Sequence, residues 1–252
     1  MKSVFIEKSL GVDIREGSVF LTLVGKKLRT IEVLAGKMIT LKPLTGKDEK
    51  AEKHFLNKVN HFLIEHDTWP ESVVVSLPRS YVTFKTFELP APDLESVRSM
   101  VEFELERQFS AGLEDLYFTF QVTPKAENIF HVASAAIKKE IANYYLELVQ
   151  KLNLKTTVLD VSTFANVNLA FSQEIENDSP IWALADISPE TLDIALIKND
   201  AIEFSRSLSW ARPAIKDANS GKISDPAQLE NLSGEIAKSI VNELQQALSS
   251  CR

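Results

Sequence analysis

The sequence predicts an α/β protein built around an internal duplication, and two observations support this prediction. Residues 11–34 (GVDIREGSVFLTLVGKKLRTIEVL) and residues 184–208 (LADISPETLDIALIKNDAIEFSRSL) follow the same pattern. In each, an Asp ends an apolar strand, a short turn follows, and an alternating strand leads into a hairpin. The second observation is a self-contained block of alternating strands and amphipathic helices between the two copies.

The two copies align without a gap at an offset of 173 residues. Asp13 and Ile14 fall on Asp186 and Ile187. The strand that follows aligns Ser18, Val19, Leu21, Leu23 and Val24 with Thr191, Leu192, Ile194, Leu196 and Ile197. The repeat therefore predicts a duplicated domain with two acidic turns that are able to face one cleft.

Composition limits the class of protein. A chain of 252 residues, 44% of them hydrophobic, can form one large domain or two lobes. The net charge of −7 without a long basic stripe argues against a nucleic-acid partner. Cys251 is the only cysteine, which excludes an intrachain disulfide or cysteine metal site and favours a reducing compartment. The N-terminus lacks the apolar core of a signal peptide, and no stretch approaches the roughly 20 apolar residues of a membrane helix.

The first lobe is expected to begin with strands near 4–13, 18–24 and 28–34. We place Gly25 in the turn between the last two, because glycine tolerates the positive φ of a tight hairpin. Apolar residues at helical spacing then predict an amphipathic helix over 48–66. This stripe comprises Ala51, Phe55, Val59, Phe62 and Leu63. Residues 73–78 follow as a buried strand.

The block between the copies is predicted as βαββα. Residues 80–88 alternate as a strand, with Tyr81, Thr83, Lys85 and Phe87 on one face. Asp93 is expected to cap the next helix by accepting its orphan amides. Strands at 116–123 and 129–137 follow, with His131 as a surface strand residue. The helix at 139–152 is expected to bury a stripe of Ile141, Tyr144, Leu148 and Leu152.

A return strand at 158–161 precedes a helix at 163–173, for which Ser162 is a plausible cap. The polar stretch 174–180 ends in proline and suggests a lobe boundary. The second copy begins at 180–187 and its hairpin turns at 198–200. Residues 211–230 are expected as a loop and 233–250 as a final helix. Because the second copy lacks the later strand of the first, we expect the second lobe to be truncated.

The order of these segments resembles the PilM-type proteins of type IV pilus assembly, members of the actin-like ATPase superfamily. The resemblance rests on the strand ending in Asp-Ile, on SLPRSYVTFKTFELPAPDLESVRSMVEFELERQF, GLEDLYFTFQV and HVASAAIKKE, and on LKTTVLDVSTFANVNLAF and LADISPETLDIALIKNDAIEFSRSLSW. It spans roughly residues 9–250. Relatives in this superfamily are the cytoplasmic domain of the secretion protein GspL and the cell-division protein FtsA.

The resemblance implies an actin-like ATPase fold, which is a duplicated ribonuclease H-like fold, with an inserted βαββα subdomain. Residues 1–78 and 153–175 would then form the first actin-like lobe (1A). Residues 79–152 would form the inserted subdomain (1C). Residues 180–252 would form part of the second actin-like lobe.

The resemblance also implies a phosphate and metal cleft at Asp13 and Asp186. Each Asp is normally followed by Ile-Gly, but here the glycine positions hold Arg15 and Ser188. Pro189, which cannot donate an N–H, and the acidic Glu190 and Glu16 weaken phosphate binding further. We therefore expect vestigial phosphate loops and no efficient turnover; ATP and Mg²⁺ would bind only if the cleft is still competent. The vestigial set is Asp13, Arg15, Ser18, Asp186, Ser188 and Thr191, of which Asp13 and Asp186 would be the metal ligands.

Other interpretations of these residues stay open. An Asp at a strand end commonly just closes a turn. Three roles stay open for Arg15: contact with a phosphate, exposure to solvent, and pairing with a neighbouring acid. His54, His61 and His66 lie on or just after one predicted helix at spacings that do not suit a metal site, so solvent exposure is the default.

The family resemblance implies a groove near Ser80–Leu89 and the helix at 94–109 that receives a segment of a PilN-like membrane protein. The expected partner-binding residues are Tyr81, Thr83, Phe84, Phe87, Leu89, Val97, Val101 and Leu105. The sequence thus predicts a non-catalytic scaffold at the cytoplasmic face of the bacterial inner membrane. It would serve a pilus or type II secretion platform and bind a membrane-protein tail or a GspE-type assembly ATPase. The alternatives are an active actin-like ATPase, a small-molecule kinase and an FtsA-like cell-division protein.

Overall fold

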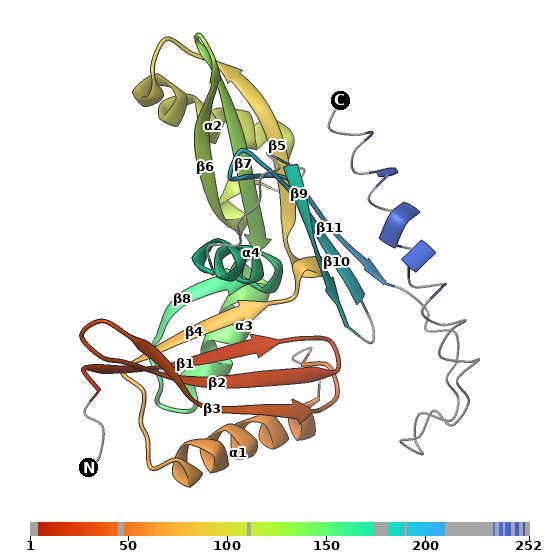
Figure 1. Cartoon of the computed structure of the whole chain (residues 1–252). Coiled ribbons are helices and arrows are strands. Elements are labelled where there is room, and N and C mark those ends of the chain that lie inside the picture. The colour runs from red at the N-terminus through yellow and green to blue at the C-terminus, as the bar shows by residue number, and fades with distance from the viewer. Residues whose placement is uncertain are drawn as a thin grey trace. The chain divides into compact units, whose positions relative to one another are not determined.

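Three β-sheets organise the part of the chain that the structure, a computed structural model, describes (Figure 1). It describes residues 5–44, 48–109, 112–173, 181–188, 191–209 and isolated positions between 234 and 249. These residues fall into two compact units. Unit 1 comprises Met1–Val82, Ala111–Phe118 and Ala136–Leu169, and unit 2 comprises Thr83–Ser110, Thr119–Ala135 and Ala170–Arg252.

The sheet of unit 1 has five strands in the order β3-β2-β1-β4-β8. The strands are β1 (Glu7–Ile14), β2 (Ser18–Lys26), β3 (Ile31–Thr40), β4 (Ser72–Leu77) and β8 (Thr156–Val161). The first three form an antiparallel meander, whereas β4 pairs in parallel with both β1 and β8. Alternate residues of β1 and β2, such as Leu10, Val12, Leu21 and Leu23, are fully buried. This alternation buries one face of the sheet.

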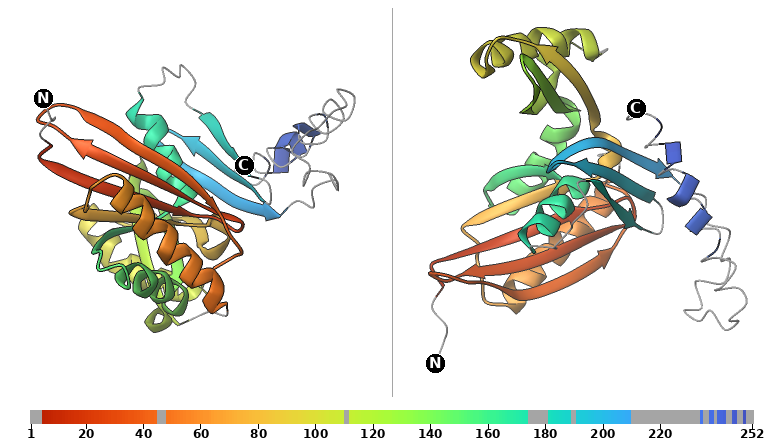
Figure 2. Two further views of the ribbon diagram at one scale, coloured as in Figure 1. Left: turned by 90° about the horizontal axis from the view of Figure 1, so that it is seen from below. Right: turned by 45° about the horizontal axis from the view of Figure 1, so that its top comes forward.

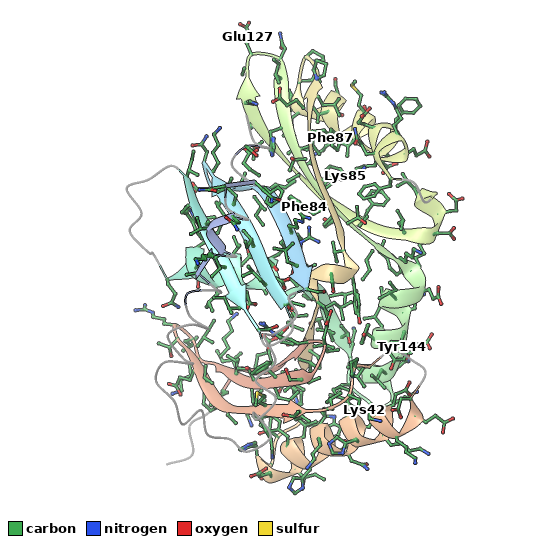
Figure 3. The ribbon with its side chains drawn as sticks, turned by 90° about the vertical axis from the view of Figure 1, so that its right-hand side faces the viewer. Lys42, Phe84, Lys85, Phe87, Glu127 and Tyr144 are labelled. Atoms are coloured by element: carbon green, nitrogen blue, oxygen red, sulfur yellow. The ribbon has the colours of Figure 1, made fainter. Side chains whose placement is uncertain are left out.

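Helices α1 (Glu49–Glu65) and α3 (Lys139–Gln150) pack against each other and against this sheet, and α1 runs across it in Figure 2. Asp48 caps α1 by accepting from the amides of Lys50 and Ala51 at 3.0 and 3.1 Å. Tyr144, labelled in Figure 3, joins the helices by donating to Glu52 at 3.1 Å. The buried residues of α1 are the predicted stripe, Ala51, Phe55, Val59, Phe62 and Leu63.

In unit 2, the sheet order β5-β7-β6 forms the inserted block. Its elements are β5 (Thr83–Pro90), α2 (Leu94–Gln108), β6 (Leu116–Ala126) and β7 (Ile129–Lys138), with the ends of β6 and β7 assigned to unit 1. As predicted, Asp93 caps α2, and its carboxylate accepts from the Ser96 amide at 2.7 Å. This hydrogen bond also lowers the pKa of the Asp93 carboxyl.

The second repeat forms the sheet β11-β10-β9 of unit 2, with β9 (Ile181–Ile187), β10 (Thr191–Lys198) and β11 (Ala201–Ser209). The register repeats at the offset found in the sequence: Asp13 opposes Phe20, and Asp186 opposes Asp193. A register shift follows at Leu23/Val24 in one copy and at Leu196/Ile197 in the other. Matching strands, register and bulge confirm the repeat as one structural unit used twice.

Several local predictions were wrong. Gly25 lies inside β2, where a Cβ would come within 2.5 Å of the Phe5 ring, and the hairpin closes instead between the Lys27 amide and the Thr30 carbonyl at 2.8 Å. Tyr81 belongs to the 3₁₀ turn η1 (Arg79–Tyr81), before β5. His131 is buried because β7 is covered on both faces.

The buried stripe of α3 was also wrong by one residue at several positions. Ala142 and Tyr145 are buried in place of Ile141 and Tyr144, and Val149 is buried as well. The predicted burial of Leu148 and Leu152 is confirmed. Helix α4 (Ser162–Ser172) begins at Ser162, one residue before the predicted start. The predicted loop at 211–230 and most of the predicted helix at 233–250 lie outside the described residues.

The buried face of α1 makes a stability prediction. Phe55→Ala removes a fully buried ring and is expected to lower the free energy of unfolding by about 3–5 kcal/mol. The matched control is Phe103→Ala on α2, whose side chain is 70% exposed and whose loss is expected to cost less than about 0.5 kcal/mol. Urea unfolding followed by circular dichroism measures both, and equal costs would contradict the assigned core.

Candidate functional site

A row of polar side chains crosses the carboxyl ends of the three parallel strands of unit 1. Asp13 of β1 is in register with Ser76 of β4, which is in register with Asp160 of β8. The carboxyl ends of parallel strands are where α/β folds usually place their ligand sites. This row, together with the residues that touch it, is therefore the candidate site of unit 1.

The Asp13 carboxylate is held from two sides. Arg15 donates from Nε to Oδ2 at 2.9 Å and forms an ion pair, while its guanidinium also lies over the Phe20 ring at 5.5 Å. Ser162, at the start of α4, donates from Oγ to Oδ1 at 2.8 Å. The same hydroxyl lies 3.0 Å from the Leu77 carbonyl at the end of β4. Asp13 thus ties β1, its own turn and α4 together.

In the structure, Arg15 of unit 1 is paired with the neighbouring acid Asp13. Of the roles considered for Arg15, pairing with a neighbouring acid is the one observed. A Mg²⁺ ion at Asp13 would have to displace this guanidinium, because the two cations compete for the same carboxylate. Within the residues that the structure describes, no three His, Cys, Asp or Glu side chains gather in a way that could hold a metal.

Next to Asp13, Ser76 is buried and Asp160 is half-buried, and hydrogen bonds satisfy the polar atoms there only in part. Burial raises the pKa of the Asp160 carboxyl, and the Val161 amide, which donates to it at 2.7 Å, opposes this shift. The hydroxyls of Ser76 and Thr163 are buried and have no hydrogen-bond partner among the described residues. Buried polar atoms of this kind are costly, which makes them a common feature of functional sites.

The second acidic turn lies in unit 2 and has its own internal network. Asp186, on β9, is half-buried opposite Asp193 of β10, which is buried and accepts from Ser207. The Ser188 and Thr191 hydroxyls lie 2.9 Å apart, and the Thr191 amide donates to Ser188 Oγ at 2.9 Å. The turn therefore uses both hydroxyls to close itself.

Each of the two turns is closed by a backbone hydrogen bond at the equivalent position. The Arg15 amide donates to the Ser18 carbonyl at 2.9 Å, and the Ser188 amide donates to the Thr191 carbonyl at 2.9 Å. These are the amides that follow Asp-Ile in each copy, where the family resemblance places glycine. Both are used inside their own turns. Asp13, Arg15 and Ser18 are thus brought together in unit 1, as are Ser188 and Thr191 in unit 2.

The predicted partner-binding residues divide into exposed, half-buried and buried positions. Thr83 is exposed, whereas Phe84 and Phe87, which follow β5 in Figure 3, are half-buried. Leu89 is buried. Tyr81 lies in unit 1, where its ring stacks on Tyr145 at 6.1 Å. The Tyr145 hydroxyl donates to the Leu44 carbonyl at 2.6 Å, and burial raises its pKa.

The three predicted residues of α2 form the core beneath the sheet. Val97, Val101 and Leu105 are fully buried. A partner could reach them only after α2 moved, so they are better described as supports of the block. The large apolar residues of α2 that are exposed to solvent are Leu94, Met100 and Phe103.

Sequence reasoning missed a contact within unit 2 between β5 and β11. Thr86 donates from Oγ1 to the Glu203 carbonyl at 3.2 Å. His131 Nε2 of β7 lies 3.7 Å from the Glu203 carboxylate, without a hydrogen-bond partner among the described residues. No spacing rule links these three positions, although the many apolar residues of β7 could have signalled its burial on both faces.

This arrangement belongs to a mixed α/β protein of the actin-like ATPase fold, as predicted. The sequence profile of the family described as type IV pilus assembly protein PilM matches residues 11–217. The chain therefore belongs to the PilM family. No curated protein matches it.

Two solved structures agree with this assignment at the level of the fold, and a third has a TM-score below 0.5. A PilM–PilN type IV pilus biogenesis complex matches with a TM-score of 0.74 and 19% identity over 96% of this chain and 76% of that one. The cytoplasmic domain of EpsL, an inner-membrane component of the type II secretion system of Vibrio cholerae, matches with a TM-score of 0.52 and 14% identity, covering 80% and 71%. A Bacteroides thetaiotaomicron protein with an actin-like ATPase fold follows at 0.48 and 11%, covering 92% and 88%.

Burial of Asp160 predicts a pH-dependent stability difference. Because its folded-state pKa is raised, the fold favours the protonated acid, and this contribution is present at low pH and lost as pH rises through the raised value. Asp160→Asn keeps the acceptor for Val161 but carries no charge. We expect its free energy of unfolding, relative to the parent chain, to be higher at neutral pH than near pH 4.

Denaturant unfolding at both pH values measures this difference. The control is Asp115→Asn, whose side chain is exposed at the end of η2 (Leu113–Asp115). If the difference in the free energy of unfolding between Asp160→Asn and the parent chain does not change with pH, the fold does not disfavour the ionised Asp160 carboxylate, and the prediction is wrong.

Proposed function

We propose that this chain is a non-catalytic scaffold of a bacterial type IV pilus assembly platform, which binds a segment of a PilN-like membrane protein. The observation that supports this most strongly is membership of the PilM family together with the match to a PilM–PilN complex. Its place would be the cytoplasmic face of the inner membrane, reached through that partner. No helix among the described residues is long and apolar enough to cross a membrane.

The scaffold role, as opposed to catalysis, is supported by the two acidic turns. Arg15 neutralises Asp13, and the amides of Arg15 and Ser188 are engaged within their own turns. A phosphate would need such amides turned toward it and a cation beside the carboxylate. These turns instead contribute hydrogen bonds that hold strand to turn and strand to helix.

ATP binding is the alternative, and one observation favours it. Asp13, Ser76 and Asp160 line up at the carboxyl ends of parallel strands, and the Ser76 and Thr163 hydroxyls are unsatisfied there. A role in type II secretion, with a GspE-type ATPase as partner, is a second variant of the scaffold proposal, supported by the EpsL match at the level of the fold.

The proposed partner contact is expected to depend on β5. A synthetic peptide from the N-terminal segment of a PilN-like protein should bind with a Kd in the micromolar range by isothermal titration calorimetry. Phe84→Ala removes a half-buried aromatic from β5 and should weaken binding by about 10-fold or more, as loss of an interface aromatic typically does.

The matched control for this titration is Glu127→Ala, at the exposed tip of the β6–β7 hairpin in Figure 3. It removes a side chain of the same block and should leave the affinity unchanged. The proposal fails if the parent chain gives no binding at micromolar peptide. If Phe84→Ala and Glu127→Ala bind equally well, the partner does not use β5.

A further inference from the structure

Strand β3 forms an outer edge of the five-stranded sheet of unit 1. Its hydrogen-bonded neighbour among the described strands is β2 alone. Strand edges present unpaired backbone groups, and natural proteins usually shield long apolar ones. Here Ile31, Val33 and Met38 are 72%, 71% and 60% exposed. An edge strand of ten residues with this much exposed apolar surface is suited to pairing with another strand.

Over residues 31–38 of β3, the burial pattern reads the same in both directions. Ile31, Val33, Gly36 and Met38 are exposed, whereas Glu32, Leu34, Ala35 and Lys37 are half-buried. The cause is the bulge: Val33 opposes Val24 and Ala35 opposes Leu23, which leaves Leu34 as the extra residue. A bulge reverses the alternation of faces beyond it. The burial of residues 31–38 is therefore symmetric about the Leu34–Ala35 peptide.

This symmetry fits an antiparallel pair with a second copy of the same strand. With the two-fold axis at the Leu34–Ala35 peptide, Ile31 lies opposite Met38 of the partner subunit and Val33 lies opposite Gly36 of the partner subunit. Residues directly opposite in an antiparallel pair share a face, and these pairs join exposed positions with exposed positions. A regular strand without the bulge could not pair with itself about this peptide, because the faces would not match.

The charges of β3 fit the same register. Glu32 lies opposite Lys37 of the partner subunit, and the two-fold axis produces this pair twice. Directly opposed unlike charges stabilise antiparallel strands, whereas like charges destabilise them. Within the chain, Lys27 pairs with Glu32, and Lys37 donates to Glu65 of α1 at 3.1 Å. The second contact holds Lys37 toward α1, and Glu32 and Lys37 are both among the half-buried positions of the strand.

From these observations we propose that the chain forms a symmetric homodimer through its β3 edges, which joins the two unit 1 sheets into one continuous sheet. The partner is a second copy of this chain. Main-chain hydrogen bonds between the edges supply affinity, and the apolar and charged pairs set the register. The interface is isologous, as two-fold symmetry requires. This dimer is independent of the PilN-like partner proposed above.

Charge reversal tests the register by sedimentation velocity across a concentration series. The parent chain should show a reversible monomer–dimer equilibrium. Lys37→Glu places a carboxylate opposite Glu32 of the partner subunit on both sides of the axis, and this repulsion should shift the equilibrium to monomer. Glu32→Lys should do the same by opposing two lysines. The double variant Glu32→Lys/Lys37→Glu restores opposite charges across the axis and should recover the dimer.

Recovery in the double variant cannot come from the intrachain pairs. In that variant Lys27 faces a lysine and Glu65 faces a glutamate, so both internal contacts become repulsive. A parent chain that remains monomeric throughout the series overturns the proposal, even if its edge captures a strand of some other protein. A dimer that is insensitive to the single reversals, or not recovered by the double one, also overturns it.

Cysteine pairing gives a second, independent readout. In a Cys251→Ser background, Ile31→Cys chains and Met38→Cys chains are mixed and mildly oxidised. Only the mixture should yield a disulfide-linked dimer, because the two copies of position 31 would lie seven residues apart along the paired strands, about 23 Å. Both substituted positions are exposed, so the changes should not disturb folding. Equal cross-linking in either chain alone, or none in the mixture, contradicts this register.

Discussion

The interaction on which the candidate site depends is the shared Asp13 carboxylate. One oxygen accepts from Arg15 in the following turn and the other from Ser162 at the start of α4. The first strand, its turn and the helix that follows the last strand of the unit 1 sheet therefore converge on a single side chain. A carboxylate engaged in this way serves as a structural tie, and this physical fact is the basis for proposing a scaffold over an enzyme.

The repeat of this unit shows how much of the fold the sequence could predict. An offset of 173 residues aligned the two Asp turns, and the structure reproduces it in strand register, in the closing hydrogen bond of each turn and in the position of the bulge. The Asp93 cap was predictable for the same local reason, because its carboxylate needs only the amide three residues ahead. Both of these patterns depend on neighbours in the sequence, and both were predicted correctly.

Features that depend on tertiary packing were not predictable in this way. Gly25 has its place because the Phe5 ring approaches the backbone, which no turn rule anticipates. His131 is buried because both faces of β7 are covered, and Tyr145 rather than Tyr144 lies in the core. The Arg15 ion pair was one of several possibilities open from the residue type alone. The symmetry of β3 required the bulge to be located first.

The central claim is that Arg15 occupies the cationic position beside Asp13, so that the turn no longer serves nucleotide chemistry. Calorimetric titration with Mg-ATP tests it most directly on the parent chain, with Asp13→Ala beside it. The account predicts no saturable heat at micromolar nucleotide for either chain. A Kd in the low micromolar range for the parent chain that is lost in Asp13→Ala would show a working nucleotide site and contradict the account.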